Sequence, residues 1–328
     1  MSGIAIPIRV DTLRRVLRLR SLTAGPLTME RKTERHDPVM VDEILDVFQL
    51  KPGMTVVDGT LGLGGHSNRF LELIAPNGTL VGFDWDKGML EIAKQRLVTL
   101  GDTRLFTVNE SFDGSARVMD DLHLKADAIL LDLGLNSAQV DDPTRGFSFS
   151  KEGPLDMRMD RSKGEPASAL LNRMSPGEIE FMLQDYGDER WARAISKKIV
   201  ERRKEQPLRT TTDLVECVLA AIPAGARDKR IHPATRTFQA VRIYVNRELD
   251  DLEDSILNAA SALAENGVLA VLSYHSGEDR IVKHAFRDLS AEGFREVFKK
   301  PLQPGEAEER RNPRSRSAKL RALVRQSI

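Results

Sequence analysis

The sequence predicts an α/β fold: a doubly wound, mostly parallel sheet of the Rossmann-like kind, interrupted by an inserted all-helical domain. Three observations lead to this prediction. Short apolar runs alternate with amphipathic segments from residue 36 to about residue 141, which is typical of strands joined by crossover helices. The alternation then stops, and a strand-like pattern returns only at residues 267–274. A glycine-rich stretch, residues 58–67, separates the first apolar run from the next amphipathic segment, as expected of a ligand-binding turn.

Composition favours a globular protein and limits its chemistry. Of 328 residues, 41% are hydrophobic and 30% are charged, which argues against wholesale disorder. The 49 basic and 49 acidic residues balance, so nucleic acid must bind to local basic patches and not to a global positive field. The single cysteine, Cys217, excludes internal disulfides and cysteine-cluster metal sites and fits a reducing compartment. We expect no bound metal. No apolar run approaches the ~20 residues of a membrane span, so we expect no membrane partner either.

Residues 1–35 form a basic extension whose arginines are interleaved with leucines and valines and which contains few acids. A mitochondrial presequence has this composition. We favour a disordered extension, or a chain that starts at Met29, because Met29 lies only a few residues before the first ordered pattern at His36. We therefore expect a cytoplasmic protein, with the mitochondrial matrix as the alternative if residues 1–28 are a presequence.

The helices and strands of the first half follow from the spacing of apolar residues and from the turn residues between them. Helix-like spacing and β-branched apolar runs alternate in this order: helix 41–48, strand 54–57, glycine turn 58–67, helix 67–74, strand 79–83, helix 90–100, strand 105–108 and strand 126–133. The carboxyl ends of parallel strands meet at one edge of a sheet, where ligands gather. Four residues fall at that edge: Asp58, Asp84, Phe112 and Asp132.

The glycine turn indicates a nucleotide-like ligand whose identity depends on details. Glycines leave the backbone amides open at the start of a helix. A dinucleotide fingerprint needs a third glycine where Ser67 stands, which argues against a nicotinamide-dependent oxidoreductase. Asp84 follows about twenty residues later, the distance expected of a ribose-binding carboxylate, although a helix-capping role is the plainer alternative. S-adenosylmethionine (SAM) fits best, because its amino-acid end needs amides and carboxylates and it has no pyrophosphate.

The middle of the chain has a helical and charged pattern without a convincing strand. Ser175 opens a capping box with Glu178, and the helix that follows reaches Gly187. The next segment, residues 190–204, is rich in lysine and arginine; a solvated helix face is its plainer interpretation. We expect residues 36–141 and 241–328 to form a discontinuous cofactor-binding domain and residues 142–240 to form an inserted helical domain that faces the substrate.

Several separated motifs carry a family resemblance. They are His36-x-Pro38-Val39, Asp58-x-Thr60-x-Gly62-x-Gly64-Gly65-His66-Ser67, Leu131-Asp132-Leu133-Gly134, Gln139-x-Asp141-x-x-x-Arg145-Gly146-Phe147-Ser148-Phe149, Pro154-Leu155-Asp156-Met157-Arg158-Met159, His232-Pro233-Ala234-Thr235-Arg236-Thr237-Phe238-Gln239-Ala240-x-Arg242-Ile243, Ser273-Tyr274-His275-Ser276-x-Glu278-Asp279-Arg280 and Asn312-Pro313-Arg314-x-Arg316-Ser317. With these motifs in order over nearly the whole chain after the extension, the chain resembles the RsmH (MraW) family of SAM-dependent methyltransferases of small-subunit ribosomal RNA.

The resemblance implies an activity and a set of cofactor contacts. The activity would be N4-methylation of a cytidine in the decoding region, on a class I methyltransferase fold, with small-subunit ribosomal RNA or the small ribosomal subunit as partner. The implied cofactor contacts are Gly64, Gly65, His66, Asp84, Phe112, Asp132 and Gln139. His66 and Gln139 rest on the resemblance alone. A homodimer is one candidate for the oligomeric state, which the sequence leaves open.

Candidates for the chemical step and for RNA binding complete the prediction. Acceptors for the N4 hydrogens are Asp132 and Asn136, with His275 as a further candidate or as a residue that only fixes its loop. Asn136 replaces a serine that the family usually has, and Gly277 replaces a leucine. Stacking partners for the target base are Phe147, Phe149 and Tyr274, each of which is more often a core residue. The RNA-binding candidates are Arg145, Arg236, Arg242, Arg314 and Arg316. The functional alternative is a catalytically silent RNA-binding or assembly factor, which predicts loss of Asp84 or of the glycines; both are present.

Overall fold

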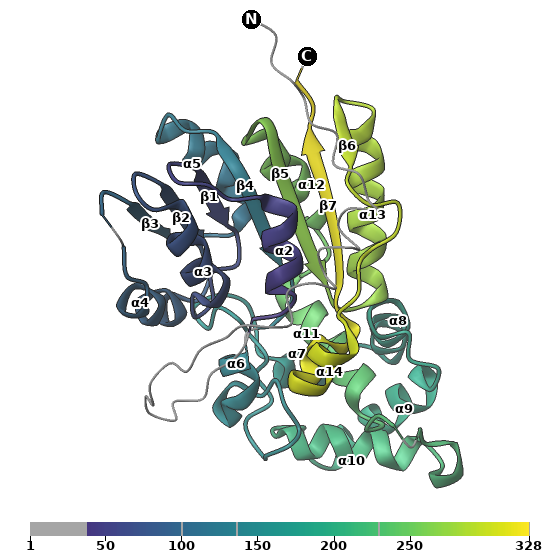
Figure 1. Ribbon diagram of the computed structural model, residues 1–328. Coiled ribbons are helices and arrows are strands. Elements are labelled where there is room, and N and C mark those ends of the chain that lie inside the picture. Colours follow the sequence, from purple (N-terminus) through teal and green to yellow (C-terminus); the bar gives the residue numbers. More distant parts are fainter. Residues whose placement is uncertain (1–37, 100, 136, 229, 328) are drawn as a thin grey trace, which may run out of the picture. The chain divides into compact units, whose positions relative to one another are not determined.

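A parallel sheet forms the centre of the structure, which is a computed structural model that describes residues 38–99, 101–135, 137–228 and 230–327 (Figure 1). The described residues contain one seven-stranded sheet with the order β3-β2-β1-β4-β5-β7-β6. The strands are β1 (Thr55–Asp58), β2 (Thr79–Phe83), β3 (Arg104–Val108), β4 (Ala126–Asp132), β5 (Leu263–Ser273), β6 (Phe294–Glu296) and β7 (Lys319–Arg325). The first five are parallel to one another, and β7 is antiparallel to both of its neighbours. This confirms the predicted doubly wound, mostly parallel sheet, with its switch point between β1 and β4.

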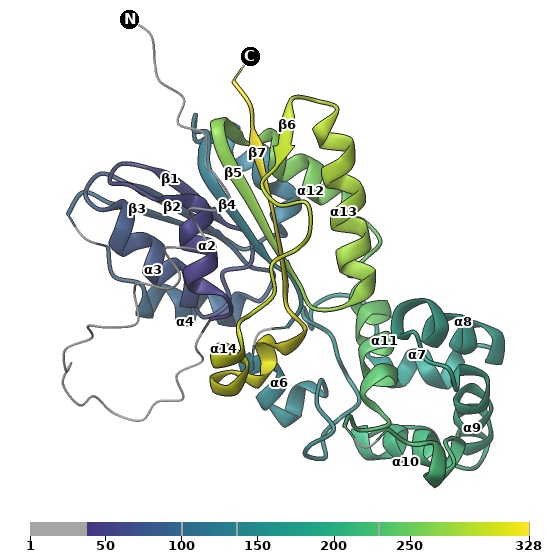
Figure 2. The ribbon, with the colours of Figure 1, turned by 45° about the vertical axis from the view of Figure 1, so that its right-hand side comes forward.

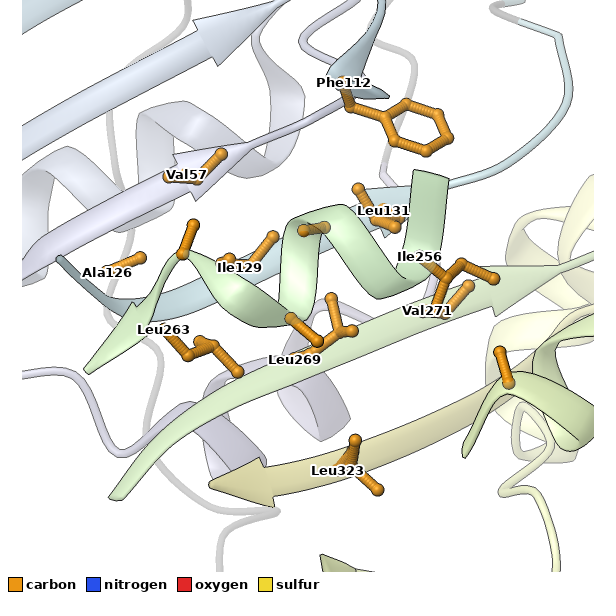
Figure 3. Packing of buried hydrophobic residues seen from close by; sticks show 14 of the residues in the cluster. Val57, Phe112, Ala126, Ile129, Leu131, Ile256, Leu263, Leu269, Val271 and Leu323 are labelled. Atoms are coloured by element: carbon orange, nitrogen blue, oxygen red, sulfur yellow. The ribbon is translucent and has the colours of Figure 1, made fainter. Parts of the chain in front are cut away.

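Helices cover both faces of this sheet (Figures 1 and 2). One face packs against α2 (Val41–Phe48), α3 (Gly65–Ile74) and α4 (Lys87–Arg96), and the other against α5 (Ser115–Asp121), α12 (Leu252–Ser261) and α13 (Ser276–Ser290). Successive residues of a strand point to opposite faces, so Leu130 joins one core and Ile129 joins the other. Figure 3 shows the second core, in which Ile256 of α12 lies over Val271 of β5. Burial on both faces explains the continuous apolar runs of the central strands.

Helices fill the chain between β4 and α12, as predicted. They are α6 (Ser137–Asp141), α7 (Ala167–Arg173), α8 (Pro176–Gly187), α9 (Ala192–Glu205), α10 (Thr211–Ala221) and α11 (Thr235–Asn246), with the short 3-10 helices η2 (Pro143–Arg145) and η3 (Ala224–Ala226). The predicted capping box is present, since Glu178 N donates to Ser175 Oγ at 3.3 Å and Ser175 N donates to Glu178 Oε2 at 2.6 Å. Most of these helices share a separate hydrophobic cluster, and both views place them beyond the carboxyl ends of the parallel strands (Figures 1 and 2).

The predicted domain boundaries remain a prediction. The residues that the structure describes form one compact unit. The boundary expected between residues 240 and 241 falls inside α11, a continuous helix from Thr235 to Asn246. The basic extension of residues 1–35 lies outside the described residues.

The C-terminal region is the main part of the fold that the sequence analysis misses. Arg314 and Arg316 were predicted there only as RNA-binding candidates, whereas the structure has α14 (Glu306–Arg311), the 3-10 helix η4 (Pro313–Ser317) and then β7 in the sheet between β5 and β6. Asp279 at the start of α13 accepts hydrogen bonds from Lys319 Nζ at 2.9 Å and from Arg321 Nε at 2.7 Å. Three cations in this seven-residue strand obscured its apolar pattern, and the partner of the first two, Asp279, is at least 40 residues away in sequence.

Candidate active site

The glycine turn runs from the end of β1 to the start of α3. Gly62 and Gly64 have φ angles of +53° and +79°, a conformation that side chains rarely adopt. A Cβ at Gly59 would clash with Leu131 and would lie 2.9 Å from Phe112 Cβ. The backbone therefore passes close to the end of β4 and to the 3-10 helix η1 (Phe112–Gly114), which only bare glycine permits.

Asp58 accepts hydrogen bonds from both ends of this turn. Its Oδ2 accepts a hydrogen bond from Ser67 Oγ at 2.6 Å, and its Oδ1 accepts one from Thr60 N at 3.2 Å. Burial raises the pKa of the Asp58 carboxyl, and the hydrogen bond from Ser67 opposes that rise. Both oxygens are thus engaged in holding the ends of the turn together.

His66 lies in the first turn of α3 and gives the best test of whether the site fits its expected cofactor. The imidazole is 6% exposed, and neither ring nitrogen has a hydrogen-bond partner among the described residues. Its Nε2 lies 3.5 Å from Asp132 Oδ2. No side chain caps α3 at Gly64. A buried imidazole that lacks a partner and an uncapped helix N-terminus together suit a carboxylate, which is what the amino-acid end of SAM carries.

Asp84 follows β2 and faces the glycine turn. Gly62 N donates to Asp84 Oδ2 and Asp86 N donates to Asp84 Oδ1, both at 2.8 Å. Asn109 fixes the backbone from β3, since its Nδ2 donates to the carbonyl oxygens of Asp84 at 2.9 Å and Trp85 at 3.0 Å. Each carboxylate oxygen keeps a second lone pair, so the pair can accept from two ribose hydroxyls. Burial raises the pKa of Asp84 to about 6.

Gln139 and Arg145 both reach Asp86, two residues beyond Asp84. Asp86 Oδ1 caps α4, and Asp86 Oδ2 accepts from Arg145 Nη1 at 2.8 Å and from Gln139 Nε2 at 3.3 Å. Burial alone would raise the pKa of Asp86, but the hydrogen bond from Arg145 and then that from Gln139 hold it below its ordinary value. Arg145 also donates to the carbonyl oxygen of Met159 at 2.8 Å. The structure therefore engages Arg145 in joining two segments, and its contact with RNA stays a prediction.

Asp132 ends β4 at the centre of the site. Asp132 N donates to Thr60 Oγ1 at 2.8 Å, and Asp132 Oδ1 accepts from the hydroxyl of Tyr274 at 2.7 Å. The structure thus brings together Asp132, His66 and the glycine turn, as the predicted cofactor contacts require. Tyr274 entered the sequence analysis only as a stacking candidate. Its position directly after β5, at the same sheet edge as Asp132, was the signal available for this contact.

The predicted aromatic residues lie in different surroundings. Phe112 is buried under the glycine turn, and Figure 3 shows its ring beside Leu131 at the carboxyl end of β4. Phe149 stacks on His232 with ring centroids 4.5 Å apart and contacts Phe238 edge-on at 5.0 Å. Phe147 is buried beneath the Arg145 guanidinium. Phe112 keeps its predicted place beside the turn, while Phe147 and Phe149 pack in the core of the inserted helices.

His275 caps α13 and belongs to a buried charged cluster. Its Nδ1 accepts from Glu278 N at 3.4 Å, and its Nε2 lies 3.1 Å from Glu278 Oε1. Glu278 Oε2 in turn accepts from Tyr274 N at 2.7 Å. This geometry supports the loop-fixing alternative for His275. Asn136, the remaining candidate for the chemical step, lies outside the described residues.

Of the other arginines predicted to bind RNA, Arg242 is the most constrained. It forms a two-pronged ion pair with the buried Glu248, with both N–O distances at 2.9 Å. Arg236 donates to the carbonyl oxygen of Asp188 at 3.3 Å, and Arg314 pairs with Asp141 at 2.7 Å on the surface. Arg316 is exposed. Their RNA contacts stay predictions, and the buried pair makes Arg242 an unsuitable residue for charge reversal.

Comparison with known proteins decides the family. A model described as the MraW methylase family matches residues 33–326. The chain belongs to the MraW methylase family. A protein named ribosomal RNA small subunit methyltransferase H from Geobacter sp. (strain M21) is 43% identical over 306 residues, 88% of this chain and 97% of that relative. Its namesake from Geotalea uraniireducens is 44% identical over 305 residues, with the same two shares of 88% and 97%.

Membership in the MraW family confirms the resemblance and the cofactor, SAM. A solved structure described as an rRNA methylase from Streptococcus thermophilus has a TM-score of 0.37 at 13% identity and covers 88% of this chain and 94% of its own. Within the part of the chain that the structure describes, every helix is too short or too polar to cross a membrane. The same residues contain no group of three or more His, Cys, Asp or Glu arranged to hold a metal ion.

Removal of the Asp84 carboxylate should weaken cofactor binding. Asp84→Ala deletes charge-assisted hydrogen bonds to the ribose worth about 2–3 kcal/mol, so SAM affinity should fall roughly thirty- to a hundred-fold. Isothermal titration calorimetry measures this, with circular dichroism as the check on folding. Unchanged affinity in a folded variant would contradict the assigned pocket.

Cofactor affinity should also depend on pH in a defined direction. Only the ionised carboxylate accepts from both hydroxyls, and a pKa of about 6 means that Asp84 becomes protonated as the pH falls through 6. The Kd for SAM should therefore rise by about tenfold per pH unit below 6. Asp84→Asn should bind weakly without this dependence; equal affinity of the parent chain at pH 5 and pH 7.5 would refute the assignment.

Proposed function

We propose that this chain transfers a methyl group from SAM to the exocyclic N4 of a cytidine in the decoding region of small-subunit ribosomal RNA. Membership in the MraW methylase family and the names of the relatives support methylation of small-subunit ribosomal RNA. The N4 assignment rests on the position of Asp132 beside the glycine turn, where its carboxylate accepts a hydrogen bond from Tyr274 and lies 3.5 Å from His66. Such a substrate locates the enzyme in the cytoplasm, where small subunits are assembled.

The chemistry requires a hydrogen-bond acceptor more than it requires a strong base. The lone pair of the cytosine amine is delocalised into the ring, and it becomes available as the nitrogen pyramidalises. When bound, SAM supplies an electrophilic methyl group on a sulfonium, which leaves sulfur with the electron pair of the broken C–S bond. Asp132 accepts hydrogen bonds from the N4 hydrogens and so favours the pyramidal amine. The proton that N4 finally loses passes to Asp132 or to water.

The remaining site residues bind the cofactor. In our proposal the Gly65 amide and the His66 ring bind the carboxylate, and Asp84 binds the ribose hydroxyls. Gly64, whose own amide donates to the carbonyl oxygen of Leu61 at 2.8 Å, forms the bend that presents them. Phe112 contributes an apolar wall on the adenine side. Gln139 and Arg145 act through Asp86, which holds the Asp84 carboxylate by a backbone hydrogen bond.

RNA must reach this site from the side of the inserted helices, because they lie beyond the carboxyl ends of the parallel strands (Figures 1 and 2). The target base has to leave its stack to enter. Helix α9 offers exposed cations in positions that share one helix face, Arg193, Lys197 and Lys204, and Arg190 precedes the helix. We infer that this stripe contacts phosphates, while Arg202 of the same helix is engaged with Asp213 at 3.1 Å.

The product test is direct. The protein should convert small subunits that lack the modification to subunits containing N4-methylcytidine, measured by nucleoside mass spectrometry with labelled SAM. Asp84→Ala is the control and should reduce the label. Label on N6 of adenine or on C5 of cytosine would refute the amine argument built on Asp132. If SAM binds but no RNA carries label, the silent assembly factor becomes the better description.

Charge reversal on α9 tests the RNA-facing surface. Arg193→Glu with Lys197→Glu should weaken RNA binding and lower the slope of log affinity against log salt by about 2. Both side chains are exposed, so SAM affinity should not change. Lys299→Glu with Lys300→Glu, two exposed lysines between β6 and α14, is the matched control for net charge. Equal losses of RNA affinity in both variants would assign the effect to overall charge and not to α9.

A further inference from the structure

Tyr274 connects two strands at the centre of the site. It follows β5 and donates its hydroxyl proton to Asp132 Oδ1 at the end of β4, with an O–O distance of 2.7 Å. Its ring also lies beside Gly134, because a Cβ at that glycine would be 3.6 Å from Tyr274 Cδ2. Gly134 has a φ angle of +97°, so it begins the turn in a conformation that favours glycine. One side chain therefore contacts both Asp132 and the turn that follows it.

The backbone of Tyr274 is held as firmly as its hydroxyl. Tyr274 N donates to Glu278 Oε2 at 2.7 Å, and the other oxygen of Glu278 lies 3.1 Å from His275 Nε2. Glu278 is 2% exposed. The next residue, Asp279, is tied to β7 by Lys319 and Arg321. Tyr274 is thus held at its backbone by Glu278 and at its hydroxyl by Asp132. Moving the hydroxyl away would break its 2.7 Å hydrogen bond to Asp132 Oδ1.

The hydroxyl of Tyr274 remains a donor at all physiological pH values. Burial, and then the charge and hydrogen bond of Asp132, raise the pKa of Tyr274 well above 10. The protonated phenol can therefore donate to Asp132 Oδ1 over this whole pH range. The other oxygen, Asp132 Oδ2, lies 3.5 Å from His66 Nε2, so a neighbour on each oxygen limits rotation of the carboxylate.

We propose that Tyr274 is a positioning residue for methyl transfer, which orients the Asp132 carboxylate toward the hydrogens of the target amine. This inference rests on the proposed function, since it gives Tyr274 a role in that reaction. Tyr274 touches neither of the two reactants in this assignment. It acts by fixing the orientation of the Asp132 carboxylate and by packing against the turn at Gly134.

The test begins with Tyr274→Phe, which removes only the oxygen. We expect kcat to fall by about tenfold, the effect of one charge-assisted hydrogen bond, while the Kd and KM for SAM change by less than about twofold. Tyr244→Phe is the matched control, because Tyr244 lies in α11 with its ring against Tyr186, 6.2 Å between centroids. It should leave kcat, KM and Tm unchanged. A Tyr274→Phe variant with unaltered kcat would overturn the inference.

A double-mutant cycle separates positioning from a structural role. If Tyr274 acts through Asp132, then Tyr274→Phe should cost less than about twofold in kcat once Asp132→Asn is present. Losses that multiply fully would show that Tyr274 acts independently of Asp132 and would overturn the inference. A parent chain that methylates no RNA would refute the proposed function and this inference together. An active parent chain with a normal Tyr274→Phe variant would refute the inference alone.

Discussion

Compensation of buried carboxylates is the constraint on which this site depends. Four carboxylates lie at the carboxyl ends of the adjacent strands β2, β1 and β4: Asp58, Asp84, Asp86 and Asp132. Burial, full or partial, disfavours the charge on such groups. Each one is therefore supplied with donors: a serine for Asp58, backbone amides for Asp84, an arginine for Asp86 and a tyrosine for Asp132. The serine and the backbone amides are local, whereas the arginine and the tyrosine come from distant segments, so satisfying the carboxylates also fixes the turns that carry them.

The parts of the site that the sequence predicts are those that depend on local pattern. The glycine turn and Asp84 follow from spacing along one strand–helix–strand unit, and the sheet edge follows from the parallel arrangement. The partners of the carboxylates do not follow, because Arg145 is 59 residues from Asp86 and Tyr274 is 142 residues from Asp132. Strand β7 was missed for a related reason: its cations resemble a solvated tail until Asp279 is known to pair with them.

The inserted helices are linked to both halves of the site. On the cofactor side, Arg145 joins Asp86 to the backbone of Met159, whose amide donates to Asn246 Oδ1 at 2.7 Å at the end of α11. On the opposite side, Arg242 of α11 pairs with the buried Glu248. Burial raises the pKa of Glu248, and the nearby charge of Glu278, the residue that holds Tyr274, raises it further. Helix α11 is thus connected by short contacts to the surroundings of both Asp84 and Asp132.

The place of β5 in the sheet has a consequence for how the chain folds during synthesis. Strands β1 to β4 are made within residues 55–132 and can pair at once, but β5, the next neighbour of β4, follows only after residues 133–262. Until then β4 is an edge strand whose Ile129, Leu130 and Leu131 have no cover from β5. Unpaired apolar edges invite association with other chains. The inserted helices therefore lengthen the interval in which a nascent chain is prone to aggregate, and rapid translation or early chaperone binding over this stretch would favour a productive yield.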